Sequence, residues 1–272
     1  MHEEEQATIG VIGGSGFSRF IEDVMEVSLT TPWGAPSAPI HVGTLGDRRI
    51  AFLPRHGAGH TIPPHKVNAR ANLWALRELG VERIFGPCAV GSLRADLPPG
   101  TFVLCDQLVD RTSGRADTYF DGPAVNHVSF ADPYCPELRS VLRSGAEATG
   151  IAMHPTGTVV VVQGPRFSTR AESRWYRQAG WEVINMTQYP EAYLARELGI
   201  CYATVALVTD FDTGVEDEPG IEPVTLAQVF EVMADNVERV RKLLEQTIAD
   251  VPIERSCSCA GAAGDVAVVP PA

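Results

Sequence analysis

Residues 158–168 read TVVVVQGPRFS, and this stretch decides the fold class of the chain. Its first five residues, Thr158 to Val162, are all β-branched, which favours a strand over a helix. A strand without alternating polar residues is typical of the centre of a parallel sheet that is covered on both faces. Polar and turn-forming residues follow from Gln163 onward and end the strand. The stretch therefore predicts a buried central strand of an α/β protein.

Short apolar runs and helical patterns alternate along the rest of the chain. We expect strands at residues 8–12, 49–53, 83–90, 101–104, 183–186 and 201–208. We expect helices at residues 72–79 and 190–198, each followed by a glycine, and at residues 226–244, where apolar residues recur at helical spacing. This order predicts an α/β fold with a central mixed, largely parallel sheet flanked by helices.

The length and composition indicate one large domain and a tail. The chain has 272 residues, of which 44% are hydrophobic, and a single α/β domain of this size buries a sizeable core. From Arg255 onward the composition shifts to Ser, Ala, Gly and Pro. We therefore expect a folded domain over residues 1–254 and a flexible tail over residues 255–272.

The chain carries a surplus of negative charge, which argues against some partners. It has 22 Lys and Arg residues against 34 Asp and Glu residues, a formal net charge of −12. Nucleic acids and anionic membranes bind basic surfaces, so neither is expected as a partner. No apolar run approaches the roughly 18 residues of a membrane span. The acidic N-terminus lacks the apolar core of a secretory signal. We expect a soluble, cytoplasmic protein.

The six cysteines fall into two groups. Four are scattered among apolar or mixed neighbours and are expected to be buried as small hydrophobic residues: Cys88, Cys105, Cys135 and Cys201. Cys257 and Cys259 form a C-x-C pair in the tail, which is consistent with a redox pair or with half of a metal site. Because no His or second Cys pair follows, we expect no zinc site.

Two strand ends carry groups that suit an anion. The sequence GGSG at residues 13–16 lets the backbone approach an anion, and Ser15 adds a hydroxyl, although a plain tight turn has the same pattern. Arg55 and His56 follow the next strand and are typical phosphate ligands, with His60 close behind. A metal site is the weaker alternative because no carboxylate lies in that stretch, and a polar surface loop is the other.

Three further strand ends offer an apolar platform and two carboxylates. Phe167 has the size to stack on a flat ring, although this segment taken alone favours a place in the core. Met186 suits packing under a sugar, and Thr187 offers a hydroxyl near the start of a helix. Asp210 and Asp212 are two residues apart on an extended backbone, so they point to one face, and mutual repulsion favours one protonated carboxyl. Metal binding and a hydrated loop are the alternatives.

Taken together, these strand-end motifs resemble the trimeric purine nucleoside phosphorylase family, and within it the members that act on 5′-methylthioadenosine. The resemblance runs from about Thr8 to about Leu244. The matching segments are GVIGGSG (10–16), PRHG (54–57), HTIPPHKVN (60–68), AVGSL (89–93), DQLVDRT (106–112), GPRFSTRAES (164–173), NMT (185–187) and TDFD (209–212).

The resemblance implies a reversible phosphorolysis, in which phosphate attacks C1′ of a nucleoside and the purine leaves. Asp210 and Asp212 would hold the purine at N7 and at its 6-substituent. The phosphate ligands would be Ser15, Arg55, His56, Ala89 and Thr187. The nucleoside ligands would be Met186, Phe167, Ser168, His60, Leu226, Val229 and Phe230, with His127 in a segment that reaches a neighbouring subunit. The resemblance also implies a homotrimer or a dimer of trimers, a role in purine and methionine salvage, and phosphate as co-substrate with no metal or other cofactor.

Two features bear on the substrate. The 6-oxopurine enzymes of the family usually carry an Asn where this chain has one of its two Asp residues, so the pair suits a 6-amino group. Leu226, Val229 and Phe230 would make an apolar pocket for a 5′-methylthio or similar group, because a buried hydroxyl there would lack a partner. The open alternatives are a phosphorylase for inosine or guanosine, a hydrolytic nucleosidase, and a purine-binding protein without activity.

Overall fold

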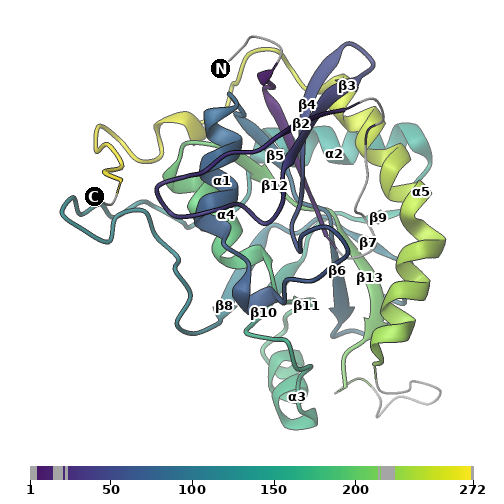
Figure 1. The fold of residues 1–272 in the computed structure, drawn as a ribbon. Coiled ribbons are helices and arrows are strands. Elements are labelled where there is room, and N and C mark those ends of the chain that lie inside the picture. Colours follow the sequence, from purple (N-terminus) through teal and green to yellow (C-terminus); the bar gives the residue numbers. More distant parts are fainter. Residues whose placement is uncertain (1–4, 15–20, 22–23, 214, 216–223, 271–272) are drawn as a thin grey trace.

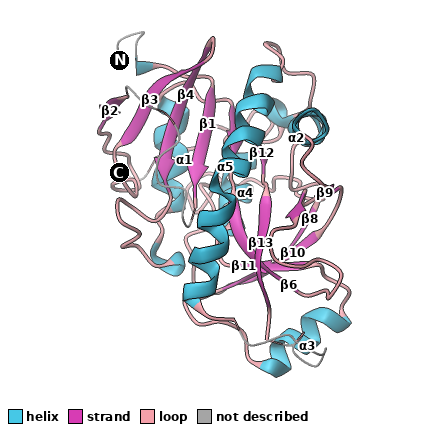
Figure 2. Ribbon diagram, turned by 90° about the vertical axis from the view of Figure 1, so that its right-hand side faces the viewer, coloured by secondary structure: helices cyan, strands magenta, loops and turns pink. Residues whose placement is uncertain are grey.

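The structure, a computed structural model, describes residues 5–14, 21, 24–213, 215 and 224–270. Within these residues the strands form two mixed sheets (Figures 1 and 2). The first sheet contains, in spatial order, β12 (Cys201–Ala203), β5 (Arg83–Phe85), β1 (Ile9–Gly13), β4 (Arg48–Pro54), β3 (Ile40–Leu45) and β2 (Met25–Val27). The second contains β8 (Gln107–Arg111), β10 (Thr158–Val162), β11 (Val183–Asn185), β6 (Cys88–Ser92), β13 (Ala206–Phe211), β7 (Phe102–Val103) and β9 (Met153–His154).

Strand β10 lies inside its sheet, as its β-branched sequence predicted. It runs parallel to β8 on one side and to β11 on the other. Its three central valines, Val159 to Val161, are fully buried. In the first sheet, β1 runs parallel to both β4 and β5. The predicted α/β class, with a mixed and largely parallel sheet flanked by helices, is confirmed, although the strands divide between two sheets.

Two of the predicted strands are each divided into two shorter strands in the structure. The predicted strand 83–90 divides into β5 and β6 at Gly86 and Pro87, and the predicted strand 201–208 divides into β12 and β13. Pro87 has no amide hydrogen to donate to a neighbouring strand. The hydrogen bonds nevertheless continue on both sides of it, from Gly86 N to Ala203 O (2.9 Å) and from Cys88 N to Val205 O (3.0 Å). The two neighbouring segments thus pass together from the first sheet into the second.

The three predicted helices are present as α1 (Ala69–Glu78), α4 (Gln188–Glu197) and α5 (Leu226–Asp250). Two of them follow capping signals: before α1, Asn68 accepts a hydrogen bond from Ala71 N, and before α5, Thr225 forms a capping box with Gln228. The sequence analysis missed α2 (Pro136–Thr149), α3 (Arg170–Gln178) and the short 3₁₀ helices η2 (Pro64–Lys66) and η3 (Cys259–Gly261). In the described part of the chain, none of the helices combines the length and apolar character that a membrane crossing requires.

Helices cover the sheets from two sides. In Figure 1, α1 and α4 lie together on the left and α5 lies on the right, while α3 projects at the bottom. Leu73, Leu76 and Leu194 belong to a hydrophobic cluster under α1 and α4. Leu142 and Leu243 belong to a second cluster, where α2 packs against α5. The sheets are therefore held between two apolar layers, which leaves the carboxyl ends of the strands open.

The predicted tail lies against the body of the protein over its described residues, 255–270. Ser256 donates from N and Oγ to Glu137 Oε2 at 2.8 and 2.6 Å. Asn126 Nδ2 donates to the carbonyl oxygen of Ala263 at 2.8 Å. Cys259 is 2% exposed. These contacts give the segment a defined position beside α2, while its flexibility stays a prediction.

The crossing between the sheets requires a glycine at position 86. A β-carbon there would lie 2.2 Å from the hydroxyl oxygen of Tyr202, which donates to Glu191 Oε1 at 2.6 Å. We expect Gly86→Ala to lower the free energy of unfolding by about 1–3 kcal/mol, because neither buried group has room to move. Denaturant unfolding followed by circular dichroism measures this. Gly261→Ala is the control, because a β-carbon at Gly261 meets nothing within 4 Å, and an equal loss in both variants would contradict the packing argument.

Candidate active site

A cavity of about 350 Å³ opens where strands from both sheets end. Gly14 follows β1, Arg55 follows β4, and Asp212 follows β13, and all three line the cavity. The start of α5 closes another side through Leu226 and Val229. Ligands of α/β proteins bind at the carboxyl ends of strands, so this cavity is the candidate active site.

Most residues that were predicted for the site line this cavity. They are Arg55, His56, His60, Ala89, Phe167, Ser168, Met186, Thr187, Asp210, Asp212, Leu226 and Val229. Phe230 lies beside them, with its ring centroid 5.6 Å from that of His60. His127 is exposed and is not among the residues that line the cavity. Ser15 lies outside the described residues.

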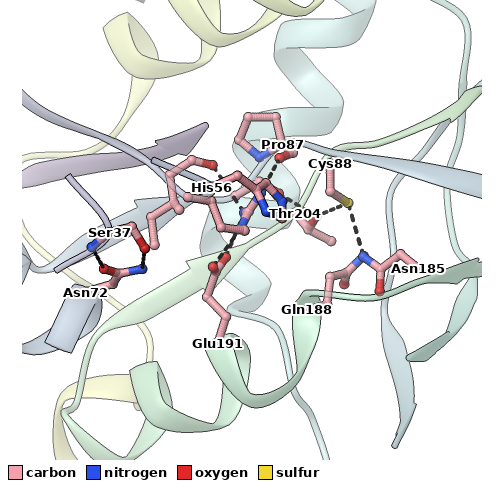
Figure 3. Close-up of polar contacts among 12 residues, drawn as sticks. Ser37, His56, Asn72, Pro87, Cys88, Asn185, Gln188, Glu191 and Thr204 are labelled. Atoms are coloured by element: carbon pink, nitrogen blue, oxygen red, sulfur yellow. Dashed lines mark hydrogen bonds and ion pairs between the residues drawn. The ribbon is translucent and has the colours of Figure 1, made fainter. Parts of the chain in front are cut away.

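A buried ion pair fixes Arg55 behind the cavity. Arg55 Nε donates to Glu191 Oε2 and Nη2 donates to Glu191 Oε1, both at 2.8 Å, and both side chains are at most 2% exposed. Nη2 also donates to Ile12 O and Nη1 to Pro87 O, each at 3.2 Å. Figure 3 shows Glu191 pointing from α4 toward Pro87. Burial alone would lower the pKa of Arg55, but the Glu191 carboxylate raises it above its ordinary value. The guanidinium is a permanent cation.

These contacts limit how Arg55 can bind an anion. A guanidinium has five N–H groups. The four hydrogen bonds to Glu191, Ile12 and Pro87 leave one N–H on Nη1. Arg55 therefore offers an anion its charge and a single donor. Sequence reasoning missed Glu191, because an acidic residue inside a helix carries no signal of its distant partner.

His56 and His60 stand next to this cation. Their ring centroids are 4.4 Å apart. His56 Nδ1 lies 2.9 Å from Ile62 O and donates to it, so in the neutral ring Nε2 is an acceptor. Burial and the neighbouring Arg55 charge lower the pKa of His56 to about 4. Burial also lowers the pKa of His60. Both imidazole rings are therefore neutral at pH 7, so Arg55 carries the positive charge at this end of the cavity. We call it the anion end.

Beside the ion pair, a cluster of buried polar side chains surrounds Cys88, the first residue of β6. Asn185 Nδ2 donates to Cys88 Sγ at 3.5 Å, and Gln188 Nε2 donates to it at 3.4 Å (Figure 3). Cys88 Sγ also lies 3.4 Å from the hydroxyl oxygen of Thr204. Burial raises the pKa of the Cys88 thiol, so it is neutral. Thr187, the N-cap of α4, makes no side-chain capping bond, which leaves its hydroxyl for the cavity.

The two predicted carboxyl groups lie at the end of β13. Asp210 pairs with Gly91 of β6, and a β-carbon on Gly91 would lie 2.9 Å from Asp210 Oδ2. Thr209 Oγ1 donates to Asp210 Oδ1 at 2.7 Å. Burial raises the pKa of Asp210 to about 7, and the Asp212 charge adds a smaller contribution. Burial also raises the pKa of Asp212. Desolvation, more than the mutual repulsion that we expected, keeps Asp210 partly protonated near neutral pH.

The remaining wall is apolar and partly open. Phe167 is 36% exposed and lines the cavity, so the alternative that it belongs to the core is wrong. Met186 follows β11 and lies on the same wall, with Leu226 and Val229 of α5 also lining the cavity. A flat, apolar face of a ligand can pack against these side chains.

Three buried polar atoms that line the cavity have no hydrogen-bond partner among the described residues. They are Ser168 Oγ, Asn185 Oδ1 and Asp212 Oδ2. A buried polar group without a partner costs free energy, so such atoms mark places where a ligand binds. The sequence analysis gave Asn185 no role, although it lies within the NMT motif. The cavity combines an anion end, two protonatable carboxyl groups and an apolar wall.

Comparison with known proteins agrees with this geometry. The family model of the phosphorylase superfamily matches residues 8–249. An S-methyl-5′-thioadenosine phosphorylase of Mycolicibacterium smegmatis is 57% identical, over 92% of this chain and 93% of its own length. A purine nucleoside phosphorylase of Streptomyces coelicolor is 50% identical, over 97% of both chains.

The fold also matches a solved structure. Methylthioadenosine phosphorylase from Schistosoma mansoni in complex with adenine superposes with a TM-score of 0.87. The two sequences are 38% identical, and the match covers 92% of this chain and 93% of the other.

The Arg55–Glu191 pair gives a stability prediction. We expect Glu191→Ala to lower the free energy of unfolding by about 3–5 kcal/mol, because it leaves the Arg55 cation buried without its partner. Urea unfolding at pH 7 measures the change. Glu245→Ala is the matched control, since Glu245 pairs with Arg241 in a half-exposed i, i+4 arrangement, which contributes about 0.3–0.5 kcal/mol. Similar losses in the two variants would contradict the assigned importance of the buried pair.

Proposed function

The chain belongs to the phosphorylase superfamily, and we propose that it catalyses the phosphorolysis of 5′-methylthioadenosine to adenine and 5-methylthioribose 1-phosphate. The observation that carries the proposal is a single cavity lined by a buried cation, Arg55, and by a carboxyl group of raised pKa, Asp210. The relatives and the solved structure named above, two of which act on methylthioadenosine by name, support this assignment.

The reaction needs an acid beside the purine. Breaking the bond between C1′ and N9 leaves an oxocarbenium-like sugar, as in glycoside cleavage. The departing base becomes an anion unless its N7 is protonated or accepts a strong hydrogen bond. Asp210, with a pKa of about 7, donates that proton. Asp212 accepts from the 6-amino group through Oδ2, the buried oxygen that has no partner among the described residues.

Phosphate binds at the opposite end, where it acts as both nucleophile and counter-charge to the sugar cation. The remaining N–H of Arg55 and the hydroxyl of Thr187 donate to it, together with the backbone at Ala89 and with Ser15. His56 Nε2 accepts a hydrogen bond from the O–H of a monoprotonated phosphate, because Nδ1–H is already bonded to Ile62 O. The reaction uses phosphate as co-substrate and needs no metal or organic cofactor.

The apolar wall binds the sugar and its 5′ group. Met186 and Phe167 pack against the ribose and the base. Leu226, Val229 and Phe230 surround the 5′-methylthio group, with His60 at the edge of this pocket. A 5′-hydroxyl would lose its hydration without gaining a partner among these side chains, so the methylthio nucleoside is preferred over adenosine.

A phosphorylase for inosine or guanosine is the second candidate, because one close relative is named a purine nucleoside phosphorylase. The carboxylate of Asp212 argues against it, since a 6-oxo group is an acceptor and would face another acceptor. Comparison of kcat/KM for inosine and for methylthioadenosine separates the two candidates.

Assembly and location complete the proposal. We propose a homotrimer or a dimer of trimers, in which His127 reaches the site of a neighbouring subunit. The exposure of His127 and of Val125, which is 69% exposed, supports this role, because both lie on a surface loop. A cytoplasmic location stays a prediction from the sequence.

Phosphate dependence tests the proposed function. We expect purified protein to release adenine from methylthioadenosine only when phosphate is present. Asp210→Ala should lower kcat by about 10²–10⁴-fold, because the leaving purine loses its acid. Asp235→Ala, an exposed site in α5, is the matched control and should leave the rate unchanged. Adenine release without phosphate would instead make the protein a hydrolase, and full activity of Asp210→Ala would refute the assigned acid.

The raised pKa of Asp210 predicts the direction of a pH effect. The acid works in its protonated form, so kcat/KM should fall as the pH rises through about 7. Phosphate also titrates in this range, so the profile is compared with that of Asp210→Asn, whose amide does not titrate. We expect Asp210→Asn to lose the part of the pH dependence that comes from Asp210 and to retain the part that comes from phosphate. Superimposable profiles would show that Asp210 is not the titrating acid.

A further inference from the structure

Four cysteines from three distant parts of the chain converge outside the candidate active site. Cys135 is the residue before α2, and Cys201 is the first residue of β12. Cys257 and Cys259 come from the C-terminal segment, which in Figure 1 crosses from α5 to the opposite side of the view. The four Sγ atoms all lie within 4.8 Å of one another. The C-x-C pair therefore meets the two further thiols that a complete metal site requires.

The arrangement of the sulfur atoms fits a tetrahedral metal better than disulfides. Cys201 Sγ and Cys257 Sγ are 3.3 Å apart, whereas a disulfide bond is about 2.05 Å long. All six cysteines of the chain are free thiols in the structure. Zinc binds four thiolates at about 2.3 Å, which separates the sulfur atoms by about 3.8 Å. A small adjustment of the side chains gives that spacing.

We propose that Cys135, Cys201, Cys257 and Cys259 bind one zinc ion in a closed, structural site. Cys135, Cys201 and Cys259 are each at most 2% exposed, so the ion would be shielded from solvent on most sides. With all four ligands from protein, no position remains for water or substrate, which is typical of structural rather than catalytic zinc. Binding displaces the remaining thiol protons to solvent.

The surroundings of the cluster suit its charge. Four thiolates and one zinc ion carry a net charge of −2. Arg196 Nη1 lies 3.9 Å from Cys259 Sγ, and Arg196 Nη2 donates to the carbonyl oxygen of Asp132. Cys135 occupies the N-cap of α2, where the helix dipole favours a negative group. A cation and a helix N-terminus thus approach the cluster from two elements, and second-shell groups of this kind orient the ligands of metal sites.

The zinc would fasten the C-terminal segment to the body of the protein. Arg255 Nη1 donates to Gly199 O at 2.9 Å, just ahead of the two C-terminal ligands, and Ser256 bonds to Glu137. Without the metal, the segment is still held by these polar contacts, by the bond from Asn126 to Ala263 O and by the packing of Val268 against the core. With the metal, the segment is tied to α2 and to β12 through two ligands on each side.

Zinc content and thiol count together test the proposal. The full chain is purified with reductant and without chelators, and zinc is measured by inductively coupled plasma mass spectrometry. Thiols are then titrated in denaturant with and without EDTA. We expect about one zinc ion per chain and six titratable thiols, with the zinc lost in the Cys257→Ser/Cys259→Ser double variant. Ser258→Ala, between the two ligands, is the matched control and should retain the zinc.

Other outcomes would overturn the proposal. Two titratable thiols and no zinc would show that the four cysteines form two disulfides instead. Six thiols with no zinc, and no uptake of added Zn²⁺, would show a cluster of plain thiols. If the double variant does not fold, Co²⁺ added to the metal-free wild-type chain decides. Tetrahedral cobalt–thiolate absorption at one equivalent supports the site, and its absence contradicts the site.

Discussion

The ion pair between Arg55 and Glu191 is the constraint on which the rest of the structure depends. Neither charge tolerates burial without the other, and the guanidinium is further bonded to carbonyl oxygens of Ile12 and Pro87. The pair therefore joins β1, β4, the crossing between the two sheets, and α4 at one point. Tyr202 adds β12 through its hydrogen bond to Glu191. The position of the anion end of the cavity is set by this network rather than by the surface loops.

The same logic of burial gives the two ends of the cavity their chemistry. At one end burial lowers the pKa of His56 and leaves Arg55 as the charged group, while at the other it raises the pKa of Asp210. The guanidinium of Arg55 is thereby charged at one end of the cavity, and the carboxyl group of Asp210 is partly protonated at the other. Phosphate and a purine each need one of these environments. The reaction proposed here follows from where the strands end.

Sequence reasoning found those strand ends because each one places a polar motif after an apolar run, as at Asp210 and Arg55. It could not find the residues that are distant in sequence but contact these motifs in the folded protein. Glu191 lies 136 residues from its partner, and nothing in its local sequence marks it as buried. The breaks at Gly86–Pro87 and after Ala203 were also missed, because apolar residues continue on both sides of each crossing; the Gly-Pro pair was the one local signal. The convergence of the four cysteines was not foreseen, since Cys135 and Cys201 come from two separate segments far from the C-x-C pair.

The separation of Arg55 from Glu191 also bears on how the protein is made. A ribosome adds roughly 5–20 residues per second, and 136 residues separate the two halves of the ion pair. Arg55 therefore emerges several seconds or more before the carboxylate that makes its burial tolerable. Through that interval the Arg55 guanidinium has no carboxylate to pair with, so it cannot yet take its buried place beside α4. The burial of Arg55 therefore waits until α4 has been synthesised, and the cavity that this side chain lines is completed late.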